Sequence, residues 1–152
     1  MTIKKQPSRR KIREKVLQAL YAYEISKDDP TYIFNTLLSD TSVQNITKNF
    51  ADSLFFDVIK NYDSFNNSIK ILSKHWREDR IAVIDKILLR MGMCELIYFG
   101  EIPAKVTLNE IIELAKQYST EKSPQFINGI LNAFYQEEIK SGRIVKHGRG
   151  LL

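Results

Sequence analysis

The feature that most constrains this chain is an apolar seam whose members recur every three or four residues over residues 50–76. The members are Phe50, Leu54, Val58, Tyr62, Phe65, Ile69, Leu72 and Trp76. This spacing follows the turn of an α-helix and places all of them on one face. The seam therefore predicts one long helix over residues 50–76, which needs packing partners along its whole length.

Helical spacing continues through the rest of the chain, and no strand-like alternation stands out. We therefore predict an all-α protein of about six or seven helices. A charged break at residues 75–80 divides it into two small packed bundles, residues 8–76 and residues 77–139. Residues 1–7 are expected to form a flexible basic arm, and residues 140–152 a basic, disordered tail.

Local signals mark where several helices begin. Ser8 is a suitable N-cap for the first helix, and Asp29–Pro30 combines an N-cap with proline at the first helical position. Ser123–Pro124 opens the last helix. Thr107–Glu110 fits a capping box, although the helix there could equally begin at Pro103.

A second apolar stripe, over residues 84–97, contains a glycine and is flanked by two acids. Gly92 costs about 1 kcal/mol relative to alanine inside a helix, which a close helix crossing would explain. Asp85 and Glu95 lie beside the stripe and could meet a basic protein, or they could simply face solvent.

The charges are distributed unevenly, although the net charge is only +5. Residues 1–15 hold seven Lys or Arg against one acid, and residues 140–152 hold four against none. Residues 16–139 hold twelve against seventeen. Basic ends on an acidic body favour a polyanion as partner, nucleic acid before membrane, unless the termini only aid solubility.

Several kinds of chemistry have no support in the sequence. The single cysteine, Cys94, cannot form an internal disulfide, and Cys94, His75 and His147 lack metal-ligand spacing. There is no glycine-rich phosphate loop, no secretory signal and no apolar run long enough to span a membrane. We therefore expect a soluble cytoplasmic protein that is not an enzyme and that binds no metal or cofactor.

A basic cluster at the start of the first helix points to RNA. Its members are Lys5, Arg9, Arg10, Lys11 and Arg13. Arginine binds phosphate and stacks on bases, and Tyr21 on the flank adds a stacking platform typical of single-stranded RNA recognition. The alternative is that Leu17 and Tyr21 pack on another helix while the arginines are merely solvated.

Three segments, in order over residues 8–136, form a recognisable pattern. The first is Arg9–Glu14 followed by Leu17–Tyr21. The second is Asp85–Gly92 with Glu95–Leu96. The third runs from Ile102–Pro103 through Asn109–Glu110, Glu113–Lys116 and Ser123 to Phe126–Gly129. Together these segments resemble the NusB family of bacterial transcription antitermination factors.

The resemblance implies two helical bundles and a non-catalytic adaptor. It implies binding of single-stranded boxA RNA together with NusE, a small-subunit ribosomal protein, and modification of RNA polymerase, notably on ribosomal RNA operons. The implied RNA contacts are Arg9, Arg10, Arg13 and Tyr21, with the neighbourhood of the last helix start, which adds Lys122, Ser123, Gln125 and Phe126. Asp85 falls on the implied NusE surface.

Two positions depart from the family pattern. Cys94 stands where an aromatic or small residue is usual, which predicts a different packing of the core. Lys122 stands where the family commonly has an acid, which predicts stronger phosphate attraction and lower sequence selectivity.

Two other functions remain open at this level. The same fold occurs at the N-terminus of a family of ribosomal RNA cytosine methyltransferases, but no methyltransferase domain follows here. The second alternative is a protein-interaction module that binds no nucleic acid. It predicts that charge reversal at Arg9, Arg10 and Arg13 leaves RNA retention unchanged.

Overall fold

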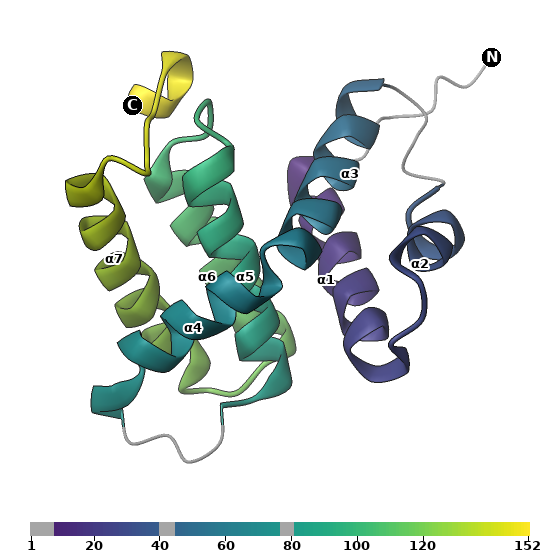
Figure 1. Cartoon of the computed structure of the whole chain (residues 1–152), viewed down its shortest axis with the longest axis horizontal. Coiled ribbons are helices and arrows are strands. Elements are labelled where there is room, and N and C mark those ends of the chain that lie inside the picture. Colours follow the sequence, from purple (N-terminus) through teal and green to yellow (C-terminus); the bar gives the residue numbers. More distant parts are fainter. Residues whose placement is uncertain (1–7, 40–44, 77–80) are drawn as a thin grey trace. The chain divides into compact units, whose positions relative to one another are not determined.

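The computed structural model describes residues 8–39, 45–76 and 81–152, and every regular element within them is a helix (Figure 1). This confirms the all-α prediction. The α-helices are α1 (Arg9–Ser26), α2 (Pro30–Leu37), α3 (Asn45–Lys60), α4 (Tyr62–Leu72), α5 (Val83–Tyr98), α6 (Ala104–Tyr118) and α7 (Ser123–Ser141). Two short 3-10 helices follow α4 and α7, namely η2 (Lys74–Trp76) and η3 (Gly148–Leu151).

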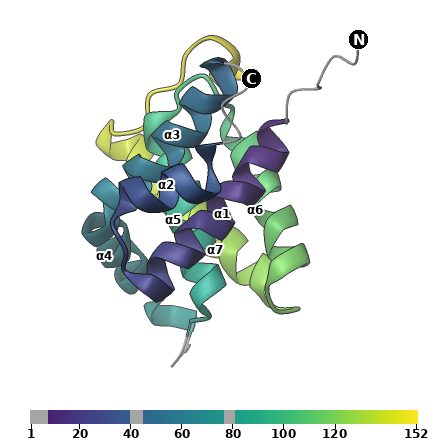
Figure 2. The ribbon, with the colours of Figure 1, turned by 90° about the vertical axis from the view of Figure 1, so that its right-hand side faces the viewer.

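The chain divides into two compact units, residues 1–60 and residues 61–152. In the first unit α1 packs against α2 and α3 (Figure 1 and Figure 2). In the second unit α5 contacts α4, α6 and α7. Because α5 is covered by three helices, its residues are buried almost all round, as expected of a helix without a polar face.

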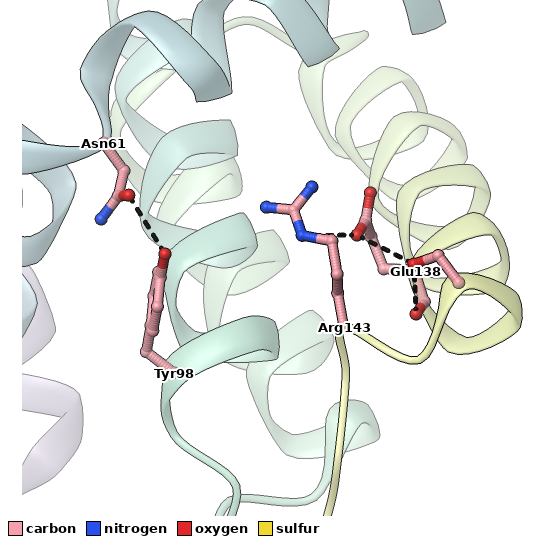
Figure 3. Close-up of polar contacts among 5 residues, drawn as sticks. Asn61, Tyr98, Glu138 and Arg143 are labelled. Carbon is pink, nitrogen blue, oxygen red and sulfur yellow. Dashed lines mark hydrogen bonds and ion pairs between the residues drawn. The ribbon is translucent and has the colours of Figure 1, made fainter.

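The predicted single helix over residues 50–76 is wrong in two respects, because it is interrupted at Asn61 and because α4 ends at Leu72, before the separate 3-10 helix η2. Asn61 has φ −104° and ψ 19°, and asparagine readily leaves the helix because its side chain competes for hydrogen bonds. Its side-chain oxygen accepts a hydrogen bond from the Tyr98 hydroxyl at 3.1 Å (Figure 3). The two units also divide beside this residue, earlier than the division predicted near residue 77.

Most predicted helix starts are confirmed. The Ser8 hydroxyl accepts from the Lys11 backbone N–H at 3.2 Å, and the Asp29 carboxylate accepts from Thr31 at 2.8 Å. The capping box at Thr107 is wrong, because α6 already begins at Ala104. Thr107 lies inside the helix, where its buried hydroxyl donates to Glu95 at 3.1 Å.

Gly92 lies at a close crossing of α5 and α7, as predicted. A Cβ atom at this position would lie 2.7 Å from Cδ1 of Leu131, a fully buried side chain of α7.

The C-terminal segment is ordered, in contrast to the predicted disorder of residues 140–152. Arg143 pairs with Glu138 at 3.2 Å (Figure 3), and the side chain of Ile144 is buried. The His147 N–H donates to the Gly100 carbonyl at 3.1 Å. Gly150 packs against the same carbonyl so closely that no side chain fits. These contacts tie the segment to the turn after α5.

The Lys146 side chain also takes part in this contact. Its Nζ donates to the Phe99 carbonyl at 3.2 Å. Burial lowers the pKa of Lys146, and the nearby Glu95 and Glu101 oppose that shift.

Candidate nucleic-acid interface

The start of α1 presents an exposed basic segment. Arg9, Arg10 and Lys11 are exposed, and the first turn contains no acid. The positive end of the helix dipole adds to their charge. The guanidinium carbon of Arg9 lies 4.6 Å from the ring centroid of Phe50, which is a cation–π contact. Lys11 forms a surface ion pair with Glu14, at 3.4 Å.

Arg13 occupies a different environment from the other members of the basic cluster. Only 3% of the residue is exposed, and its guanidinium lies 5.2 Å from the centroid of the Phe50 ring. The structure therefore places this predicted RNA contact in the interior, where it packs with the ring that Arg9 also contacts. Lys5 lies outside the described residues.

Leu17 and Tyr21, on the flank of α1, were expected either to pack on another helix or to leave the tyrosine ring free for stacking, and the structure separates them. Leu17 is buried, so it belongs to the core rather than to an exposed face. Tyr21 is 44% exposed and keeps a ring surface available for stacking.

The loop between α6 and α7 is the second candidate region. Thr120, Lys122 and Gln125 are exposed here, whereas Ser123 and Phe126 are buried. The predicted site residues of this segment therefore separate into a surface pair, Lys122 and Gln125, and a supporting pair.

The predicted partner-facing acids both point inward. Asp85, in the first turn of α5, is only 6% exposed. Its carboxylate accepts from the Ser119 hydroxyl at 2.5 Å and from the Ser123 hydroxyl at 2.8 Å. Glu95 is fully buried, with Thr107 as a donor.

Sequence reasoning did not assign Trp76 to this region. Its ring meets that of Phe126 edge to face, with centroids 5.4 Å apart and an interplanar angle of 85°. It also covers Gly129, where an added Cβ would lie 2.5 Å from the indole. The signal available in the sequence was a glycine inside an otherwise regular helix.

A pocket of about 130 Å³ opens between the start of α5 and the α6–α7 loop. Lys122, Ser123 and Phe126 line it on one side and Ala82 and Asp85 on the other. One cation, one carboxylate, two hydroxyl groups and an aromatic side chain thus line one concave surface.

The comparison with family models decides the relationship. The model of the NusB family matches residues 10–136. The chain belongs to the NusB family.

Individual NusB proteins agree with this assignment. The transcription antitermination protein NusB of Chloroherpeton thalassium is 40% identical over 146 residues, which are 95% of this chain and 69% of that protein. NusB of T. maritima has a TM-score of 0.79 at 31% identity, covering 88% of this chain and 94% of that one. A crystal structure of the antitermination factors NusB and NusE in complex with dsRNA has a TM-score of 0.71 at 25% identity, with 85% and 96% covered.

Membrane and metal features are both missing from the part of the chain that the structure describes. No helix in these residues has the length and apolarity that a membrane crossing requires. Nor do the described residues contain a group of three His, Cys, Asp or Glu side chains placed to hold a metal ion.

Proposed function

We propose that this chain is a non-catalytic, RNA-binding antitermination adaptor of the cytoplasm. It binds boxA RNA together with NusE and thereby modifies RNA polymerase, notably on ribosomal RNA operons. The observation that carries the proposal is the pairing of family membership with an exposed basic helix start, at Arg9, Arg10 and Lys11.

The RNA contacts that we propose are the exposed members of the predicted set. Arg9, Arg10 and Lys11 attract phosphates, and Tyr21 stacks on an unstacked base. On the second unit, Lys122 and Gln125 supply a cation and an amide beside the pocket. The exposed groups are those that can reach a polyanion without unfolding the chain.

The buried members of the set act beneath the surface. Arg13 supports Arg9 through Phe50, and Phe126 forms the floor of the second region with Trp76. The burial of Asp85 argues against a direct contact with NusE. NusE itself is proposed as partner because the related crystal structure contains it.

The test is fluorescence anisotropy of a labelled single-stranded boxA RNA, a scrambled RNA and a boxA duplex. Each is titrated with this protein at two salt concentrations, with and without NusE. We expect tightest binding to the single strand, because stacking on Tyr21 requires an unpaired base. NusE should tighten it further by a coupling of about 1–3 kcal/mol. Equal, salt-sensitive binding to all three RNAs would contradict the proposal.

The variant Lys122→Glu tests the second region. Removing the exposed cation beside the pocket should weaken boxA binding and make its salt dependence shallower by about 0.7 in slope. Unchanged RNA affinity would remove Lys122 from the interface.

A further inference from the structure

One carboxylate joins the two ends of the α6–α7 loop, residues 119–123, to a third helix. Ser119 follows the last residue of α6 and Ser123 is the first residue of α7, and both donate to Asp85 of α5. Their hydroxyl oxygens lie 2.9 Å apart. A single side chain therefore bridges the two ends of this loop.

The number of hydroxyl hydrogens fixes the direction of the network. Each serine has one hydroxyl hydrogen, and both are used on the Asp85 carboxylate, which can only accept. The Ser123 oxygen therefore accepts from the Thr120 N–H at 3.2 Å and from the Thr120 hydroxyl at 2.7 Å. The exposed Thr120 is in this way held in place by the same carboxylate, through Ser123.

From this arrangement we infer that Asp85 is a positioning residue of the RNA interface, which holds the α6–α7 loop in its binding conformation. The inference rests on the proposed function. Asp85 itself is buried and both its oxygens are occupied, so it acts through the loop. The groups that the loop exposes are those of Thr120, Glu121 and Lys122, of which Thr120 and Lys122 can donate to phosphate and base groups.

Loss of the Asp85 network is expected to weaken boxA binding, because the loop is then no longer preorganised. A loop that is not held must be ordered when RNA binds, and that ordering weakens the complex. Hydrogen bonds to a charged acceptor are among the stronger ones in proteins, so a loss of about tenfold in boxA affinity is expected.

The variant Asp85→Asn separates positioning from simple electrostatics. It keeps the size of the side chain, removes one negative charge and replaces one acceptor oxygen by a donor. Charge alone would strengthen RNA binding, whereas the loss of the network weakens it. Glu113→Gln is the matched control, because it makes the same charge change at an exposed position of α6. We expect weaker boxA binding for Asp85→Asn and equal or slightly tighter binding for Glu113→Gln.

Ser119 supplies a milder pair of variants, because it is only half-buried. Ser119→Ala should reproduce the loss of boxA affinity, and Ser119→Thr, which keeps the hydroxyl, should restore it. The double variant of Asp85→Asn with Ser119→Ala should lose little more than either alone, since both act on one network. The salt slope should stay as in the wild type, because no phosphate contact is removed.

The experiments distinguish failure of the positioning role of Asp85 from failure of the proposed RNA-binding function. If the wild type does not prefer boxA over the scrambled RNA, the proposed function fails. If it does, but Asp85→Asn and Ser119→Ala bind boxA as the wild type does, the positioning role fails alone. NusE binding can also be measured without RNA. If Asp85→Asn weakens it and Ser119→Ala leaves it unchanged, Asp85 is a direct partner contact and the inference is overturned.

Discussion

Replacing Gly129 of α7 by alanine is expected to displace the Trp76 side chain, which packs against this glycine from η2. The new Cβ would lie 2.5 Å from Cζ2 of the indole, whereas ordinary contacts begin near 3.4 Å. The ring must therefore move by about 1 Å, or the whole side chain must swing outward. Trp76 is 36% exposed, so solvent leaves room for that movement.

Two opposing terms set the size of the effect on stability. Alanine favours the helix by about 1 kcal/mol over glycine. Loss of the edge-to-face contact between Trp76 and Phe126 costs about 0.5–1.5 kcal/mol. The free energy of unfolding should therefore change by no more than about 1 kcal/mol, while the environment of the indole changes strongly.

Fluorescence reports this directly, because Trp76 is the only tryptophan in the chain. We expect emission shifted to longer wavelength, easier quenching by iodide and weaker boxA binding, since Phe126 loses its partner. Ala133→Gly, at an exposed position of the same helix, is the control for helix propensity alone. If Gly129→Ala gains about 1 kcal/mol in stability with unchanged emission and quenching, the steric reasoning is refuted.

Three further perturbations test other parts of the molecule. Arg10→Glu should lower RNA affinity and make its salt dependence shallower. Lys105→Glu, the same charge change at an exposed position of α6, should have a smaller effect. Equal losses in the two variants would mean that the basic segment attracts RNA only through net charge. Gly92→Ala should lower the free energy of unfolding in urea, because overpacking against the buried Leu131 costs about 1–3 kcal/mol and outweighs the gain in propensity; a more stable variant would contradict the close crossing. The pKa of Lys146 is lower in the folded chain than its usual 10.5, so its buried charge costs stability at neutral pH, and that cost disappears as pH rises to 10.5. The stability of the wild type relative to Lys146→Met should therefore increase with pH in urea titrations, and a difference that is constant with pH would show that Lys146 is not desolvated.

Much of the local structure was predictable because its causes lie within a few residues. The caps at Ser8 and Asp29 follow from side chains that bond to nearby backbone groups, and the start of α7 follows from the proline in its first turn. The buried stripe of α5 follows from apolar periodicity. Even the close crossing at Gly92 was predictable, because a glycine that weakens its helix is tolerated where a neighbouring helix leaves no room for a Cβ.

The break at Asn61 was not predictable, because the seam keeps its spacing across it. A single asparagine costs a helix little by itself. What accompanies the interruption is a hydrogen bond from Tyr98, which is distant in sequence. Likewise Thr107 has the pattern of a cap, but its hydroxyl meets Glu95 inside the second unit.

By itself the sequence determined the helical class, most helix starts, the basic ends and the resemblance to a family of RNA-binding adaptors. Only the tertiary structure decided which charged residues face solvent. It buried Arg13 and Glu95, turned Asp85 toward two serines, and ordered a glycine-rich tail against Gly100. The physical reason is that a helix places side chains on faces by local geometry, whereas burial depends on what another segment brings to that face.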